Sequence, residues 1–472
     1  MKPNNGIGIP LSLATSSIKK THGACFSIKM GQCILNYTTI ARLAGLRLGI
    51  SWDEDAKVFY RWDENITAHT PLHKRHVPSL VRSYTQKLLK KEGAPRSGQS
   101  VSKRDLAEII TTLQATCPFP RPYSQNYFPA KNGVIRFGPA GIRKLSPRRC
   151  FGFKHVAIAS YTKSQTPTKF LKLLNQVLPD LTDQKLLLKY LGGAFTGNNS
   201  TRQMLVMRGP GGSAKSTILA VVESLLGAPW VGDLRIQHLS GRFEHSHYIG
   251  KRLISAKDIP GDSLKLPSAK FLKPLSGGDL LQAEQKYGGF ARLSGSPHIV
   301  LTSNGELLLE LADDGQAWKD RLIILDLRRP ENIKRIANYA DVLVSKEGDA
   351  ILSMLLHAGM EYKQEVQTFG SLQLSPLQKQ RVDNLLYASE SLDHFVKTRI
   401  EPTQSACIGG SAISVAYVRY CQERQWKPVS LAVLRARLPD LMLLHHGSTR
   451  NVPLVENNKA ILGWGNLALK TN

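Results

Sequence analysis

The residues best suited to chemistry form a glycine-rich segment, GPGGSAKST, from Gly209 to Thr217. The apolar residues 204–208 before it predict a strand, and the residues after it predict a helix. Backbone N–H groups of such a turn, together with a helix N-terminus, surround phosphates. Lys215 would reach the terminal phosphates, and the Ser216 hydroxyl would hold Mg²⁺. The predicted ATP-binding residues are Gly209, Gly211, Gly212, Ser213, Ala214, Lys215, Ser216 and Thr217.

Polar residues also follow two later apolar stretches that predict strands. Asp258 comes after residues 252–256, and a carboxylate at the end of a buried strand can hold the Mg²⁺ of a nucleotide. Asn304 comes after residues 297–303, where an amide can orient an attacking water, although Asn-Gly is also a common turn pair. Arg321 precedes a third apolar stretch, where an arginine can reach the ATP of a neighbouring subunit. A surface arginine paired with Asp320 is the alternative for this position.

The composition indicates a folded protein that binds a polyanion. The chain has 472 residues, enough for about two to four domains. Lys and Arg outnumber Asp and Glu by 63 to 36, which gives a net charge of +27 and favours a nucleic-acid partner. None of the six cysteines forms a C-x-x-C pair, so we expect reduced thiols and no zinc site. The absence of a long apolar run predicts no membrane association and a cytoplasmic location.

The elements that must position these residues indicate an α/β fold. Residues 58–62 alternate like a strand, and residues 77–91, 167–196, 333–364, 385–397, 412–424 and 430–438 have helical spacing. The helices at the C-terminal end, followed by two short strand-like segments, suit a winged helix. We expect an arm at 1–35, an accessory α/β domain at 36–165, a helical collar at 166–200, a P-loop ATPase domain at 201–330, a helical extension at 331–372 and a winged-helix domain at 373–472.

The order of the motifs from Gly209 to Arg321 resembles that of the superfamily 3 helicases. Residues 272–279, LKPLSGGD, and 282–287, QAEQKY, are similar to the helix, turn and hairpin of that superfamily. The flanking segments at 132–134, NGV, and 190–197, YLGGAFTG, resemble the phage and plasmid primase–helicase family, which includes the poxvirus primase–helicase. The C-terminal segments around Tyr417 and Trp464 are similar to the winged-helix tail of that family.

This resemblance implies an AAA+-like P-loop ATPase that forms a ring, usually a hexamer, and unwinds DNA with ATP and Mg²⁺. Lys215 would bind the β- and γ-phosphates, Ser216 and Asp258 would hold Mg²⁺, Asn304 would sense the γ-phosphate and Arg321 would act on a neighbouring subunit. DNA would be contacted by the hairpin residues Lys286, Tyr287 and Arg292. A cation that pairs with phosphate beside an aromatic ring that stacks on a base suits single-stranded DNA. The implied partners are single-stranded and forked DNA, further copies of the chain, and a separate primase or polymerase.

Two residues depart from the family pattern. Ala214 stands where a glycine usually precedes the lysine, and Lys257 stands where related enzymes often carry a second acid. Asp258 or Glu284 would then activate the water. An AAA+-like initiator or loader, or a DNA-binding replication protein with a weak ATPase, therefore remains the alternative.

Three further patterns have a less specific interpretation. Asp53-Glu54-Asp55 resembles a metal-binding pair of acids, but it lacks a histidine partner and is better explained as a solvated turn. His69, His73 and His76 have helical spacing interrupted by Pro71, which favours surface or DNA-facing histidines over a metal site. Residues 429–438, with Arg435 and Arg437, suit a recognition helix on DNA, with packing against a neighbouring domain as the alternative.

Overall fold

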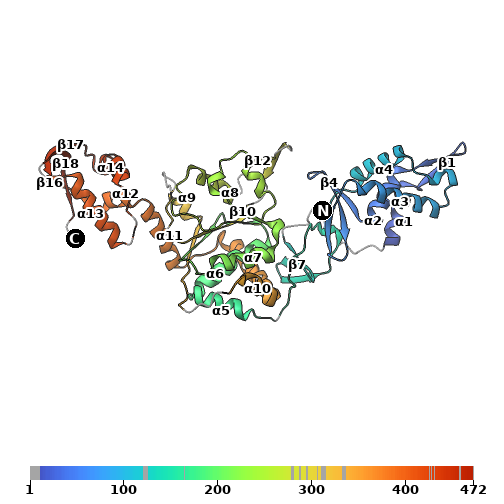
Figure 1. Cartoon of the computed structure of the whole chain (residues 1–472), viewed down its shortest axis with the longest axis horizontal. Coiled ribbons are helices and arrows are strands. Elements are labelled where there is room, and N and C mark those ends of the chain that lie inside the picture. The colour runs from blue at the N-terminus through green and yellow to red at the C-terminus, as the bar shows by residue number, and fades with distance from the viewer. Residues whose placement is uncertain are drawn as a thin grey trace.

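The structure is a computed structural model, and its three parts lie in a row along the longest axis of the molecule (Figure 1). The N-terminal part is followed by a central α/β part and then by a C-terminal part at the far end. Residues described are 11–120, 126–163, 165–277, 281–285, 289–293, 296–305, 307–309, 315–331, 336–424, 426, 428–429, 431–456 and 459–470. Within these residues, no helix combines the length and apolar character needed to cross a bilayer.

From residue 11 onward, where the structure describes it, the N-terminal part contains four α-helices and two small antiparallel sheets around a core of its own. Helix α4 begins with a capping box, in which Ser102 and Asp105 each accept a hydrogen bond from the backbone N–H of the other. The expected arm at 1–35 is wrong from residue 11 onward, because a helix and a hairpin occupy this stretch. The elements are α1 (Leu11–His22), β1 (Phe26–Lys29), β2 (Gln32–Leu35), α2 (Tyr37–Leu48), β3 (Ile50–Asp53), β4 (Val58–Asp63), β5 (Ala68–Leu72), α3 (His76–Lys91) and α4 (Lys103–Thr116).

A three-stranded sheet after the N-terminal part shares the core of the central part. Its strands are β6 (Tyr127–Ala130), β7 (Gly133–Gly138) and β8 (Gly141–Leu145). Phe128 and Ile135 of this sheet are fully buried in one cluster with side chains of the central part. The boundary predicted at residue 165 therefore does not separate two cores.

The central part is built on a five-stranded sheet with strand order β10-β11-β14-β9-β15, and all four of its strand pairs are parallel. The inner strands are apolar and buried on both faces, as expected for a sheet covered by helices on both sides. This arrangement confirms the predicted α/β class. The strands are β9 (Met204–Arg208), β10 (Val231–Asp233), β11 (Leu253–Ala256), β14 (His298–Ser303) and β15 (Leu322–Asp326).

Alternate residues of each strand enter two separate cores. In β9, Leu205 and Met207 join a cluster that contains the helices α6, α7 and α10, whereas Met204 and Val206 face a second cluster beneath α8 and α11. This alternation follows from the period of two residues in a strand. The helices are α5 (Thr168–Val177), α6 (Leu181–Thr196), α7 (Lys215–Leu226), α8 (Leu272–Gly277), α9 (Gly315–Lys319), α10 (Tyr339–Phe369) and α11 (Pro376–Ser389).

Helices α6 and α10 cross at two glycines. A Cβ on Gly192 would lie 2.4 Å from the carbonyl oxygen of Leu355, and a Cβ on Gly359 would lie 2.4 Å from the carbonyl oxygen of Gly192. The two backbones are therefore in direct contact, which only glycine permits at these positions.

The C-terminal part combines three helices with a three-stranded antiparallel sheet and has its own core around Phe395, Tyr417 and Trp464. The single helix predicted at 385–397 is wrong, because the chain breaks at Glu390 between α11 and the next helix. A third strand was not predicted. The elements are α12 (Ser391–Arg399), β16 (Ile400–Ile408), α13 (Gly410–Glu423), α14 (Leu431–His446), β17 (Arg450–Glu456) and β18 (Lys459–Leu469).

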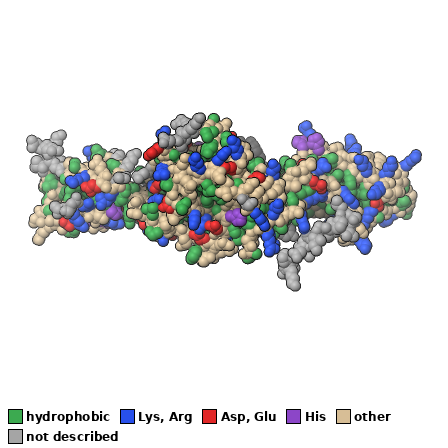
Figure 2. Space-filling model, turned by 90° about the horizontal axis from the view of Figure 1, so that it is seen from below, with side chains coloured by type: hydrophobic (Ala, Val, Ile, Leu, Met, Phe, Trp, Pro, Cys, Tyr) green, Lys and Arg blue, Asp and Glu red, His purple; other side chains and the backbone are tan. Residues whose placement is uncertain are grey.

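Basic side chains are spread over all three parts on the face shown in Figure 2. Arg75 directly before α3, and Lys87, Lys90 and Lys91 within it, are exposed, and the first turn of the helix contains no acid. The surface therefore offers cations along the length of the molecule, as the net charge of +27 predicts.

The three histidines with helical spacing do not share a surface. His73 and His76 are exposed, whereas His69 is buried against the rings of Trp62 and Phe119. The prediction of a surface position for His69 is therefore wrong. Among the described residues, no group of three or more His, Cys, Asp and Glu side chains has the arrangement of a metal site.

Candidate functional site

The glycine-rich segment forms a loop between the carboxyl end of β9 and the N-terminus of α7. Gly209 and Gly212 have φ angles of 153° and 86°, in the region that favours glycine. A Cβ on Gly209 would lie 2.0 Å from the carbonyl oxygen of Leu327, because the chain after β15 runs directly against the loop. Ala214 has φ 59° and so adopts a left-handed conformation with a methyl side chain.

Lys215 directs its ammonium into the loop. Its Nζ donates to the carbonyl oxygens of Gly209 at 2.6 Å and Pro210 at 3.2 Å, and it lies 3.1 Å from both Ser213 Oγ and Asn304 Oδ1. Burial lowers the pKa of Lys215, and the negative charge of Asp258 partly offsets this effect. The loop therefore holds one partly desolvated cation at its centre.

Asp258 and Asn304 meet the loop at the same edge of the sheet. Their strands β11 and β14 pair in parallel, and β14 pairs in parallel with β9. The backbone N–H of Asp258 donates to Thr302 Oγ1 at 2.9 Å, which fixes the tip of β11 against β14. Asp258 has φ 51°, a left-handed conformation that aspartate tolerates better than most residues. The structure thus brings Lys215, Asp258 and Asn304 together, as their positions after parallel strands predict.

The two hydroxyl residues after the lysine lie in the first turn of α7. Ser216 is exposed and Thr217 is half-buried. Gly211 and Gly212 are exposed on the loop, and a Cβ on Gly211 would meet no atom within 4 Å. The backbone of the loop at Gly211 and Gly212 is therefore accessible to solvent, as is Ser216 in the first turn of α7.

Lys257, at the position where related enzymes often carry a second acid, directs its side chain to α7. Its Nζ lies 2.7 Å from Glu223 Oε2, and Ser255 Oγ donates to Glu223 Oε1 at 2.8 Å. Glu223 therefore connects α7, the helix after the loop, to β11 and to Lys257, which directly precedes Asp258.

Arg321 lies at the opposite edge of the sheet. It joins α9 to β15, and its carbonyl oxygen accepts a hydrogen bond from the backbone N–H of Met204 at the start of β9. Its Nη1 donates to the carbonyl oxygen of Ala317 at 2.8 Å, and its buried Nε has no partner among the described residues. Because β9 and β15 are parallel, the length of the strand separates Arg321 from the loop of its own chain.

The predicted hairpin is present as two antiparallel strands, β12 (Leu281–Gln285) and β13 (Gly289–Leu293). Arg292 pairs with Gln282 in this register, and Glu284 pairs with Phe290. Lys286 and Tyr287 lie outside the described residues. Their proposed contact with DNA stays a prediction.

Arg329 is a candidate residue that sequence reasoning missed. It is exposed, and its side-chain Nε and Cγ lie 3.6 and 3.8 Å from the point where a Cβ would stand on Gly212. Its neighbour Arg328 instead donates from Nε to the carbonyl oxygen of Gln176. The available signal was an arginine pair directly after an apolar strand, but its position beside the loop requires knowledge that β15 is adjacent to β9.

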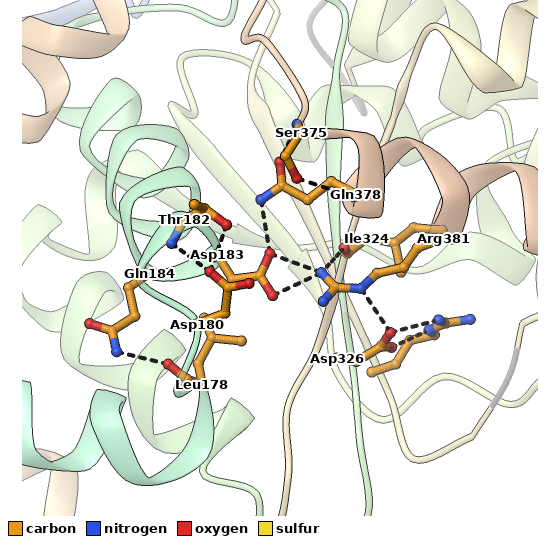
Figure 3. A network of polar contacts seen from close by, with 11 residues as sticks. Leu178, Asp180, Thr182, Asp183, Gln184, Ile324, Asp326, Ser375, Gln378 and Arg381 are labelled. Atoms are coloured by element: carbon orange, nitrogen blue, oxygen red, sulfur yellow. Dashed lines mark hydrogen bonds and ion pairs between the residues drawn. The ribbon is translucent and has the colours of Figure 1, made fainter.

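An ion-pair network supports the start of the loop (Figure 3). Arg208, the last residue of β9, donates from Nε to Asp326 Oδ1 at 2.8 Å, and Arg381 of α11 lies 3.3 Å from Asp326 Oδ2. Arg381 also pairs with the buried Asp183 of α6, which accepts a further hydrogen bond from Gln378. Burial alone would lower the pKa of Arg381, but Asp183 and then Asp326 raise it. Two strand ends and two helices are therefore held together immediately before Gly209.

Residues 207–321 match the model of a family of unknown function (DUF5906). The matched segment contains the glycine-rich loop, Asp258, Asn304 and Arg321. No curated protein matches this chain in sequence.

Two solved structures of the C-terminal region of NrS-1 are similar to the chain. The A form apo structure has 9% sequence identity and a TM-score of 0.46, covering 88% of this chain and 95% of that chain. An apo structure of residues 305–718 has 11% identity and a TM-score of 0.43, with coverage of 88% and 95%. Both TM-scores are below 0.5, so neither likeness establishes a shared fold.

Proposed function

We propose that this chain is an ATP-dependent DNA helicase of the superfamily 3 kind that acts in replication of a virus, phage or plasmid-like element. The observation that carries the proposal is the convergence of Lys215, Asp258 and Asn304 at the carboxyl edge of a parallel sheet. Phosphate ligands of open parallel sheets bind at this edge, where successive strands lie on either side of a central strand. Here β14 and β15 lie on either side of β9.

In this proposal, the loop is a P-loop and the central part is an AAA+-like ATPase. Lys215 exchanges its carbonyl partners for the β- and γ-phosphates, and backbone N–H groups of the loop surround them. Ser216 and Asp258 have the oxygen ligands that Mg²⁺ prefers. Bound Mg²⁺ would neutralise charge on the phosphates. Arg329 adds a second cation on the exposed side of the loop, at Gly212.

DNA would be bound by surfaces outside this edge. The hairpin of β12 and β13 would present Lys286, Tyr287 and Arg292 to single-stranded DNA in the channel of a ring. The order of helices and strands in the C-terminal part suits a winged helix, and its α14 exposes Arg435 and Arg437. The net charge of +27 supports binding to a polyanion.

The first experiment compares ATP hydrolysis with and without single-stranded DNA in the wild type, Lys215→Ala and Asp258→Asn. We expect DNA to stimulate hydrolysis and each substitution to reduce it by about 100-fold or more, because each removes charge that stabilises the transferring phosphate. Unwinding of forks with 3′ or 5′ tails then tests the motor and reports its direction. A wild-type protein with no ATPase activity, or an active Lys215→Ala variant, would rule out the motor.

Arg321 is tested by mixing subunits. Because Arg321 is distant from the loop of its own chain, we propose that it completes the site of a neighbour. Arg321→Ala and Lys215→Ala are each expected to be inactive alone, and a mixture should recover part of the activity at interfaces where both residues are intact. Absence of any recovery would count against a shared site.

An initiator or loader that binds duplex DNA is the second candidate. The observation in its favour is α14, whose exposed arginines suit a duplex groove. This candidate would be favoured over a helicase if the protein binds duplex DNA without unwinding it, and if the double substitution Arg435→Ala plus Arg437→Ala abolishes that binding.

A further inference from the structure

A cavity of about 590 Å³ lies between the N-terminal part and the central part. One wall comes from residues 52–55, 118–119 and 152–155, and the other from residues 229–230, 249–250 and 252. Arg252 directly precedes β11, whereas Asp258 follows that strand, so the cavity and the glycine-rich loop lie at opposite edges of the sheet. The two parts adjoin in Figure 1, with the small sheet of β6, β7 and β8 beside the junction.

Arg252 forms the innermost cation of this cavity. Its guanidinium carbon lies 3.7 Å from the centroid of the Trp230 ring, and its Nη1 donates to the carbonyl oxygen of Phe195 at 3.1 Å. The side chain is half-buried, and burial lowers its pKa to about 9, so it is still charged at neutral pH. Among the described residues, no carboxylate pairs with it. A guanidinium has five N–H donors, so most of its hydrogen-bonding capacity is unused.

Aromatic side chains form much of the remaining wall. Trp52 and Phe153 are buried, and Phe119 and Trp230 are partly exposed. The ammonium of Lys154 lies 5.0 Å from the Phe119 ring centroid. A cation next to aromatic faces is the arrangement that proteins use to hold a phosphate together with a stacked base.

Of the other charged side chains at the cavity, that of Asp55 is exposed, and those of Lys154, Asp53 and Glu54 have partners. Lys154 pairs with Asp53 at 2.7 Å, and Asp53 also accepts hydrogen bonds from the backbone N–H groups of Asp55 and Ala56. Glu54 accepts from Trp52 Nε1 and pairs with Lys57. His155 is held next to Trp230, and burial lowers its pKa to about 4, so it is neutral at physiological pH. Arg252 is therefore the group in this cavity that an anion would complete.

We propose that this cavity binds a nucleoside phosphate, with the phosphate on Arg252 and the base among Phe119, Phe153 and Trp230. The nucleotide is either a unit of single-stranded DNA or a free mononucleotide, since both carry the same phosphate and base. The volume lies in the range that proteins use for small-molecule ligands, about 300–1,000 Å³. The site does not include the glycine-rich loop, so it does not depend on ATP hydrolysis.

The test is photo-crosslinking of the full chain to two probes, 5-iodo-dUMP and a twelve-residue oligo(dT) with one 5-iododeoxyuridine. Crosslinked peptides are identified by mass spectrometry. We expect crosslinks at Phe119, Phe153 or Trp230, and at least a fivefold lower yield in Arg252→Gln. Crosslinking by the oligonucleotide alone identifies a DNA strand as the ligand, and crosslinking by 5-iodo-dUMP identifies a free nucleotide.

The controls separate this site from DNA binding elsewhere. Lys172→Gln removes an exposed cation of α5 away from the cavity and should leave the yield unchanged. Phe119→Leu, at a half-buried position, should lower the yield even if Arg252→Gln proves unstable. Crosslinks confined to other parts of the chain, or a yield at the cavity that neither variant lowers, would overturn the proposal. ATPase activity measured on the same samples reports the glycine-rich loop separately.

Discussion

Two non-glycine residues at the candidate site have left-handed backbones. Ala214 has φ 59° immediately before Lys215, and Asp258 has φ 51° at the tip of β11. For a residue with a Cβ, this conformation is about 1–2 kcal/mol less favourable than the right-handed one. Ala214, which stands where related sequences usually have glycine, is therefore also a position of local backbone strain in the fold.

Ala214→Gly should relieve this strain. We expect the free energy of unfolding to rise by up to about 1 kcal/mol, since glycine adopts this φ without a steric cost. Ala220→Gly, within the same helix α7, is the matched control and should lower it by about 1 kcal/mol. Urea unfolding measures both, and a loss of stability in Ala214→Gly would show that the methyl group contributes more by packing than it costs in strain.

Arg329→Ala should weaken ATP binding by about tenfold, as expected when one charge-assisted contact with a phosphate is lost. The paired control is Arg328→Ala. Arg328 belongs to the same segment, but its Nε donates to the carbonyl oxygen of Gln176, and its side chain is not among those next to Gly212. Titration with a fluorescent ATP analogue measures both affinities. Equal effects of the two substitutions would remove Arg329 from the site.

At the scale of elements, the contact between α6 and α10 sets the position of the helix layer beneath the sheet. Tyr190 Oη of α6 lies 2.9 Å from the carbonyl oxygen of Gln203 and 3.0 Å from that of Ile299, and it accepts a hydrogen bond from the backbone N–H of Ile299, so α6 is also fixed to the strands. The close approach at Gly192 and Gly359 leaves no room for a side chain on either helix.

Gly192→Ala should lower the free energy of unfolding by roughly 1–3 kcal/mol, because the new methyl group forces the two backbones apart. The control is Gly348→Ala. Gly348 lies in α10, the other helix of this pair, and a Cβ there would meet only side-chain atoms at 3.6–3.8 Å. That control should be neutral or stabilise the protein by up to about 1 kcal/mol. Similar losses from both substitutions would indicate that an added methyl group destabilises this helix pair at either position, and that the close backbone contact at Gly192 is not the cause.

Elements explain why part of the site was predictable. Lys215, Asp258 and Asn304 each follow an apolar strand, and parallel strands end at one edge, so the sequence was enough to group them. Arg329 and the ion pairs of Asp326 depend on β15 lying beside β9, which no local pattern reveals. The break at Glu390 was missed because apolar residues continue on both sides of it. Leu385 and Ala388 are buried in α11, and Leu392 and Phe395 are buried in α12.

At the scale of the whole molecule, the buried hydrophobic side chains of the described residues form five clusters. One lies in the N-terminal part, one in the C-terminal part and two adjoining ones in the central part, and a small fifth cluster contains Val134, Phe151 and Phe153. Unfolding is therefore expected in more than one step, and each step can have its own dependence on pH.

The central part should lose stability as the pH falls below about 6.5. Burial lowers the pKa of His298 to about 3 and that of His155 to about 4, so both are neutral in the fold and bind a proton on unfolding. Each group then contributes about 1.4 kcal/mol per pH unit between about pH 6.5 and its lowered pKa, and nothing above pH 6.5. His298→Leu should roughly halve the slope measured by thermal unfolding. His73→Gln, at an exposed position, should not change it, and an unchanged slope in His298→Leu would refute the assignment.

The strand that carries the glycine-rich loop also determines when the central part becomes complete during synthesis. Met204 of β9 pairs with Ile299 on one side and Leu322 on the other, so β9 has no strand neighbour until residues far downstream have left the ribosome. The N-terminal core, from Cys25 to Leu113, needs no such distant partner. During synthesis, the N-terminal part would thus be folded while the apolar strand β9 is still unpaired. The chain is most prone to aggregation, and most dependent on chaperones, during this interval.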